Sequence, residues 1–85
     1  MRAKIYITLK NGVLDPQGKA TQSALKHLGF ESVAGVRQGK LIEMDIVETD
    51  RTKASAQVES MCKQLLANSV IENFSYDLVA VNEAA

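Results

Sequence analysis

Apolar and polar residues alternate from Ala3 to Leu9, and this period of two is typical of a strand with one buried face. The alternation stops at Asn11-Gly12. Asp15 can then accept hydrogen bonds from the free amides of a first helical turn, and Pro16 falls at the first helical position, where its missing N–H costs nothing. The sequence therefore predicts a strand, a turn and a helix that begins at Pro16 and ends before Gly29.

The start of this helix allows two interpretations. In the simpler one, Asp15 and Pro16 begin a helix and have no other role. In the other, Gln17, Gly18 and Lys19 form a contact surface at the helix N-terminus for a partner. The residues alone leave both open.

The rest of the chain repeats the change from strand-like to helical spacing. It predicts, in order, a strand over 30–38, a corner at Gln38-Gly39, a strand over 40–48, a helix from 49–52 to about 66, and a strand over 70–79. The order is therefore β-α-β-β-α-β. Right-handed crossovers convert this order into a two-layer, ferredoxin-like α+β sandwich, with a four-stranded antiparallel sheet in the order 4-1-3-2 and both helices on one face. We expect residues 1–85 to form a single domain.

The second face of such a sheet meets either water or another chain. Tyr6, Leu41 and Val47 make the predicted face more apolar than a free surface requires. A solvated face with scattered apolar residues is one interpretation. We favour burial of these three residues in an oligomer, because a small two-layer domain gains stability in that way.

The composition argues against several functional classes. Ten basic and ten acidic residues balance, which is not typical of a nucleic-acid surface. One cysteine, Cys62, and one histidine, His27, are too few for a zinc site, and we expect no metal and no cofactor. Apolar runs are too short for a membrane span or a secretory signal, so the cytoplasm is the expected location. Glu43 and Asp45 share a strand face, where a cross-strand ion pair is favoured over acid–base chemistry.

A second polar cluster follows at Arg37-Gln38-Gly39-Lys40. Its two cations can bind a phosphate or the carboxylate of a partner, or they can lie at a solvated hairpin tip. No set of residues combines a nucleophile, a base and an oxyanion stabiliser. The sequence therefore does not predict an enzyme that acts alone.

Four segments of the chain are distinctive in combination: Lys4–Lys10, Val13–Ala20, Val36–Lys40 and Met61–Glu72. Together they resemble the PurS family, the small subunit of phosphoribosylformylglycinamidine synthase in purine biosynthesis, and the similarity runs in register from about Ala3 to Leu78. The Leu-Asp-Pro-Gln-Gly run and the Arg-Gln-Gly-Lys run are specific in combination.

The resemblance implies a non-catalytic subunit of an ATP-dependent, glutamine-hydrolysing ligase. Such a subunit bridges the synthetase and glutaminase subunits, supports ammonia transfer, and forms dimers or tetramers. The expected partner-facing residues are Asp15, Pro16, Gln17, Gly18, Arg37, Gly39 and Lys40, with Asp15 and Pro16 serving mainly to set the helix entry. The alternative is an oligomeric regulatory domain of the same topology that binds a small ligand. Acylphosphatase-like and RNA-binding sandwiches fit less well, because the first loop lacks arginine and the open face lacks stacking aromatics.

Overall fold

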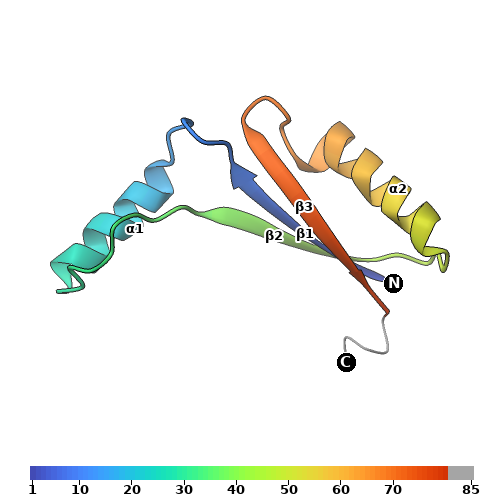
Figure 1. Ribbon diagram of the computed structural model, residues 1–85, viewed down its shortest axis with the longest axis horizontal. Helices are drawn as coiled ribbons and strands as arrows, with labels where there is room; N and C mark the ends of the chain where they lie inside the picture. Colours follow the sequence, from blue (N-terminus) through green and yellow to red (C-terminus); the bar gives the residue numbers. More distant parts are fainter. Residues whose placement is uncertain (81–85) are drawn as a thin grey trace.

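A computed structural model describes residues 1–80 of the chain. Figure 1 shows its elements along the sequence. They are β1 (Arg2–Leu9), α1 (Pro16–His27), β2 (Gly39–Asp45), α2 (Arg51–Met61), the short π-helix η1 (Cys62–Leu66) that continues α2, and β3 (Glu72–Val79). The chain is thus an α+β protein with two main helices and one sheet. None of the helices in the described part is long and apolar enough to cross a membrane.

The sheet is antiparallel and has the order β2-β1-β3. Its inner face carries the predicted alternation, since Ala3, Ile5 and Ile7 of the central strand are fully buried. Val58 of α2 and Cys62 of η1 pack on them and are also fully buried. Partly buried residues surround this core: Ile42, Met44, Ile46, Leu66, Phe74, Tyr76 and Leu78. The period-two patterns therefore predicted the inner faces of all three strands correctly.

The sheet has three strands, not the four that the sequence predicted. Residues 30–38 form no strand within the chain, and the predicted corner at Gln38-Gly39 does not reverse the chain direction. Figure 1 shows the backbone running on from this segment into β2. The ferredoxin-like order 4-1-3-2 is therefore not present in the single chain.

The position of α1 also differs from the prediction. Its ends are as expected: Asp15 is the N-cap, Pro16 occupies the first turn, and Gly29 has a φ of +99° just beyond the C-cap. However, α1 lies beyond the end of the sheet and does not cover its inner face beside α2 (Figure 1). Side-chain contacts of Asp15 and Arg37 at the junction between α1 and the sheet are compatible with this position and would be broken if α1 folded back on the sheet by a reversal at Gln38-Gly39.

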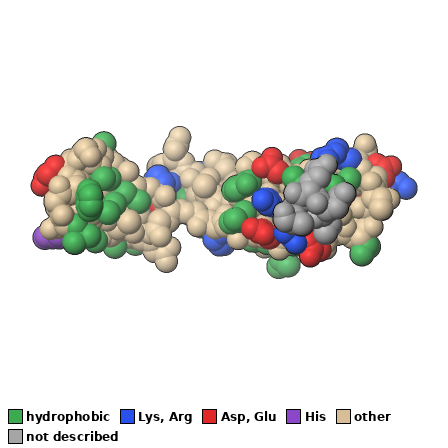
Figure 2. All heavy atoms as spheres, turned by 90° about the horizontal axis from the view of Figure 1, so that it is seen from below, with side chains coloured by type: hydrophobic (Ala, Val, Ile, Leu, Met, Phe, Trp, Pro, Cys, Tyr) green, Lys and Arg blue, Asp and Glu red, His purple; other side chains and the backbone are tan. Residues whose placement is uncertain are grey.

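The molecule is elongated as a result. It measures 48 × 32 × 14 Å, and its radius of gyration of 16.3 Å exceeds the value of about 12 Å expected for a compact chain of this length. The spacing of the apolar residues in α1 and at its C-cap places Ala20, Ala24, Leu25 and Leu28 on one side. Leu28 is 73% exposed. Figure 2 shows hydrophobic side chains gathered at the end of the molecule that α1 occupies.

Candidate functional site

The Asp15 carboxylate joins the start of α1 to the segment before β2. Its Oδ1 accepts a hydrogen bond of 2.8 Å from the amide of Gly18, which is the N-cap interaction that the sequence predicted. Its Oδ2 accepts a second bond of 2.8 Å from the amide of Gln38. Asp15 is only 6% exposed. One buried side chain therefore fixes two segments that are more than twenty residues apart.

Arg37 reinforces this connection. Its guanidinium donates hydrogen bonds to the carbonyl oxygens of Leu9, Lys10 and Val13 at 3.2, 3.1 and 3.3 Å. Its Nε also lies 4.0 Å from Asp15 Oδ2. We call these contacts of Asp15 and Arg37 the Asp15–Arg37 clamp. The clamp ties the exit of β1, the entry of α1 and the entry of β2 together.

The clamp favours the ionised carboxylate. The amide of Gln38, and then that of Gly18, lower the pKa of Asp15 below its ordinary value of 3.8. Partial desolvation opposes this shift, and the positive charge of Arg37 adds to it. Asp15 is thus a charged structural group at neutral pH.

Both glycines of the predicted interface, Gly18 and Gly39, occupy positions where a side chain would clash with the backbone. A Cβ on Gly18 would lie 2.5 Å from the carbonyl oxygen of Val36 and 2.7 Å from Asp15 Oδ2. A Cβ on Gly39 would lie 2.4 Å from the carbonyl oxygen of Ile7, next to Thr8, its partner in the sheet. These glycines permit backbone approaches within the chain. Whether they also contact a partner stays a prediction.

Three other predicted interface residues are exposed around the clamp. Pro16 and Gln17 lie on the first turn of α1. Lys40 is the second residue of β2, and its Nζ lies 3.6 Å from a carboxylate oxygen of Glu72 on β3. The seven predicted residues therefore divide into four with close contacts at the junction, which we call the framework (Asp15, Gly18, Arg37, Gly39), and three that surround it (Pro16, Gln17, Lys40). Arg37 and Gly39 of the framework are exposed as well.

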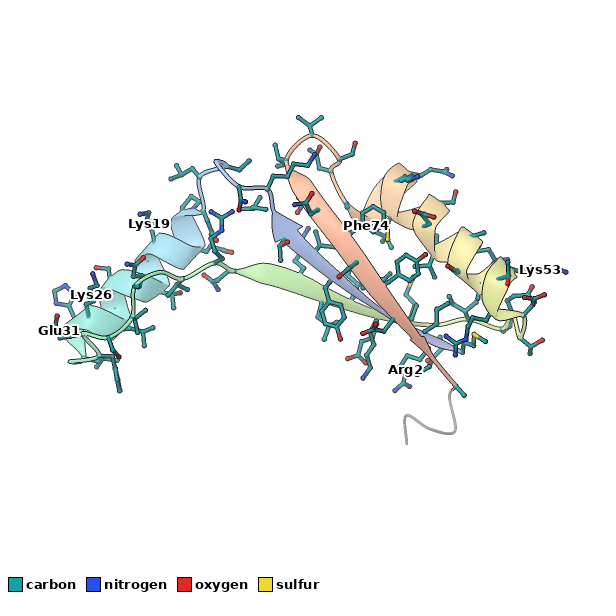
Figure 3. All side chains as sticks on the ribbon, viewed as in Figure 1. Arg2, Lys19, Lys26, Glu31, Lys53 and Phe74 are labelled. Atoms are coloured by element: carbon teal, nitrogen blue, oxygen red, sulfur yellow. The ribbon has the colours of Figure 1, made fainter. Side chains whose placement is uncertain are left out.

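An open groove of about 460 Å³ lies beside the clamp. It is bounded by the loop 12–15, by Lys19 and Gln22 of α1, and by the segment 34–37. Figure 3 shows Lys19, Lys26 and Glu31 along the part of the chain that extends past the sheet, whereas Arg2 lies near its opposite end. The groove therefore belongs to the junction and not to the packed core.

The outer face of the sheet has the predicted apolar residues in part. Tyr6 and Leu41 are cross-strand partners and are 41% and 53% exposed. Val47 is fully exposed, but it lies beyond the end of β2. Asp45 forms an ion pair of 3.0 Å with Arg2 on β1, which fits the cross-strand interpretation of the acidic residues on this face. Tyr6 and Leu41 form one patch, which leaves burial in an oligomer as a prediction.

The cysteine of the chain is buried and its thiol is not activated. Cys62 is buried in the core, where desolvation, and then the charge of Glu59, raise the pKa of its thiol. Within residues 1–80, no group of three His, Cys, Asp or Glu side chains could hold a metal ion.

The comparisons with known proteins agree with this structure. The PurS family profile, described as phosphoribosylformylglycinamidine (FGAM) synthase, matches residues 2–80. The PurS subunit of Synechocystis sp. is 48% identical over 81 residues, which cover 95% of this chain and 81% of that protein. The PurS subunit of Bacillus subtilis is 44% identical over 80 residues, which cover 94% of each chain.

Solved structures show the same fold. The crystal structure of Methanocaldococcus jannaschii PurS, a subunit of formylglycinamide ribonucleotide amidotransferase in the purine biosynthetic pathway, superposes with a TM-score of 0.84 at 41% identity. The superposed residues make up 94% of this chain and 96% of the M. jannaschii chain. A chain in the structure of PurLQS from Thermotoga maritima superposes with a TM-score of 0.79 at 26% identity, covering 93% and 99%. The chain therefore belongs to the PurS family of subunits of phosphoribosylformylglycinamidine synthase, an enzyme of purine biosynthesis.

Proposed function

We propose that this chain is a non-catalytic subunit that holds the synthetase and glutaminase subunits of phosphoribosylformylglycinamidine synthase in a fixed relative position. The observation that carries the proposal is the match to a PurS chain in PurLQS, a structure whose name combines PurL, PurQ and PurS. A fixed position would let ammonia released at one active site reach the other without loss to water, since positioning alone accelerates a coupled reaction. The active site that joins the substrates and the ATP-binding site would both lie on the partner subunits.

The geometry of the clamp supports this role. A subunit that positions two partners needs a rigid connection between its surfaces, and Asp15 and Arg37 join three segments of the chain with five hydrogen bonds. Pro16, Gln17 and Lys40 surround this connection and are exposed. We assign the contact with the partners to these three residues. Asp15, Gly18, Arg37 and Gly39 would act through the framework.

Charge reversal at Lys40 tests the assignment. Lys40→Glu is expected to weaken assembly with PurL and PurQ, because it reverses one of the exposed charges of the proposed surface. Lys53→Glu on α2 makes the same chemical change at another exposed lysine and serves as the control. The measurements are co-purification of the three subunits and glutamine-dependent turnover. Wild-type assembly and turnover in Lys40→Glu would remove this residue from the interface.

A regulatory domain that binds a small ligand is the second candidate. The groove of about 460 Å³ beside the clamp favours it, because Lys19 and Arg37 lie on its lining. The hydrogen bonds of Arg37 to three carbonyl oxygens argue against it, because they occupy the guanidinium. Calorimetry of the isolated protein with nucleotides and amino acids distinguishes the two functions. Tight binding of any of these ligands would favour regulation.

Three further parts of the proposal concern the whole chain. We propose that residues 1–85 form one PurS-like domain, that it acts in the cytoplasm, and that it associates with further copies of itself. The elongated shape and the exposed apolar side of α1 support self-association.

A further inference from the structure

The loop between β1 and α1 contains a pair of residues that can react with each other, Asn11 and Gly12 (Figure 1). The side-chain amide of an asparagine has an electrophilic carbon, Cγ, which the backbone nitrogen of the next residue can attack to close a five-membered ring. A side chain on that next residue hinders the attack, and glycine has none. Asparagine followed by glycine is therefore the pair in which this ring closes most readily.

The fold leaves both reacting groups free to move. Asn11 and Gly12 are exposed, and within residues 1–80 no hydrogen bond engages the Asn11 side chain, the Asn11 carbonyl oxygen or the Gly12 amide. The residues on either side are joined by a bond of 3.1 Å from the amide of Val13 to the carbonyl oxygen of Lys10. The peptide plane between Asn11 and Gly12 can therefore rotate while its neighbours stay in place, and Gly12, with a φ of +86°, tolerates such a change.

Asn68, followed by Ser69, provides an internal comparison because it is also exposed. Its Oδ1 accepts a hydrogen bond of 3.1 Å from the amide of Val70. Its carbonyl oxygen accepts two more, from the amides of Ile71 and Glu72 at 3.1 and 2.7 Å. Rotation of the peptide plane after Asn68 would break the last two bonds. The fold therefore restrains Asn68 at the groups that it leaves free in the other loop.

We propose that Asn11 is a site of spontaneous deamidation in the folded protein, with water as the only other reactant. The Gly12 nitrogen loses its proton and bonds to Cγ of Asn11, and the side-chain nitrogen leaves as ammonia. Water then opens the resulting succinimide ring. Attack of water at Cγ gives aspartate, whereas attack at the main-chain carbonyl carbon gives isoaspartate, in which the main chain runs through the former side chain. In sum, one amide and one water become one carboxylate and one ammonium ion.

The isoaspartate product alters the Asp15–Arg37 clamp. Arg37 donates hydrogen bonds to the carbonyl oxygens of Lys10 and Val13 at 3.1 and 3.3 Å, so it spans the two ends of the reacting pair. Isoaspartate adds one carbon–carbon bond of about 1.5 Å to the main chain between these two oxygens. Both hydrogen bonds are already longer than the common value of about 2.9–3.0 Å, and a displacement of that size breaks at least one of them. Deamidation of the loop therefore weakens the junction that orients α1.

Peptide mass mapping of the full chain tests the site. The native protein and the protein unfolded in guanidinium chloride are kept at mildly alkaline pH, which favours loss of the amide proton, and are sampled over time. The native Asn11 peptide is expected to gain one mass unit at close to the rate of the unfolded chain. The Asn68 peptide is expected to react at least about tenfold more slowly in the native than in the unfolded protein, because its hydrogen bonds must open first.

The comparison of each asparagine with itself removes the intrinsic effect of the residue that follows it. Asn11→Ser removes the electrophilic amide, and its peptide is expected to keep its mass. An Asn11 peptide that stays unmodified in the native protein while it reacts in the unfolded chain would overturn the proposal. Equal protection of Asn11 and Asn68 by the fold would overturn it as well.

Urea unfolding of the purified product tests the effect on the clamp. Deamidation adds one negative charge to a chain whose formal net charge is zero, so anion exchange separates the product, and reversed-phase chromatography resolves its isoaspartate form. This form is expected to unfold at a lower urea concentration than the unmodified chain. Asn11→Asp adds the same charge without lengthening the main chain, and it is expected to unfold close to the wild type. Equal midpoints for the isoaspartate form and Asn11→Asp would refute the effect on the clamp, and neither measurement depends on the proposed function.

Discussion

Gly18→Ala measures how much the clamp depends on a close backbone approach. In an ordinary helix this substitution stabilises the protein by up to about 1 kcal/mol, because alanine has the higher helix propensity. Here the new Cβ would lie 2.5 Å from the carbonyl oxygen of Val36 and 2.7 Å from a carboxylate oxygen of Asp15. Both atoms are held in place: the first belongs to the backbone, and the second belongs to a carboxylate whose two oxygens each accept one amide hydrogen bond. The clash therefore cannot be relieved by rotating a flexible side chain.

The expected sign is the reverse of the helix-propensity effect. Overpacking of this kind costs about 1–3 kcal/mol. Since the first turn of a helix gains less than its interior from alanine, we expect Gly18→Ala to lower the free energy of unfolding by about 1–2 kcal/mol. Gly35→Ala is the matched control, because a Cβ added at this position would meet nothing within 4 Å and its φ is not positive. We expect it to be neutral or stabilising by up to about 1 kcal/mol, through the entropy of the unfolded chain.

The assay is urea unfolding followed by far-ultraviolet circular dichroism. All variants are compared at one protein concentration, because association with a second copy contributes to the apparent stability. A Gly18→Ala variant as stable as the wild type, alongside a normal Gly35→Ala, would refute the close approach of α1 to Val36. It would also remove the main reason to assign Gly18 to the framework.

Two further predictions concern the titratable groups. Because the folded state lowers the pKa of Asp15, its contribution to stability is present above the ordinary carboxyl pKa and is lost as the pH falls through the lowered value. Asp15→Asn is therefore expected to be less stable than the wild type at pH 7, with a difference that shrinks toward pH 2 in urea titrations; a constant difference would contradict the role of the charge. Cys62, buried and with a raised pKa, is expected to react with a maleimide at pH 7 only after unfolding in urea, and rapid labelling of the native protein would contradict its place in the core.

The sequence predicted local structure well because local chemistry determines it. The alternation from Ala3 to Leu9 indicated the correct buried face of β1, and Asp15, Pro16 and Gly29 indicated the correct ends of α1. These features depend on neighbours within a few residues, which a sequence displays directly. The same holds for the helix predicted from 49–52 to about 66, which the structure divides into α2 and η1 and whose Val58 and Cys62 lie in the core.

The long-range arrangement could not be predicted in the same way. Glycine after Gln38 is typical of a tight hairpin, and the sequence offered no sign that the chain continues straight at this point. The decisive contact joins Asp15 to the amide of Gln38 across 23 residues. An N-cap carboxylate uses one oxygen for the helix amide, and its other oxygen is available in every such cap. The sequence does not indicate whether a distant N–H group donates to that second oxygen. Only the structure shows that this oxygen accepts a hydrogen bond from Gln38, at the end of the segment 30–38.

The buried or confined positions of the framework residues change our expectation of which side chains contact a partner. The two motifs that carried the family resemblance, Leu-Asp-Pro-Gln-Gly and Arg-Gln-Gly-Lys, are the two sides of one junction in the structure. Their most distinctive members, Asp15, Gly18 and Gly39, have buried or sterically confined positions that explain their identity without a partner. A motif of this kind specifies the direction in which a segment leaves the sheet. Recognition then falls to exposed side chains beside it, Gln17 and Lys40 among them, and to the apolar side of α1, whose exposure the junction itself creates.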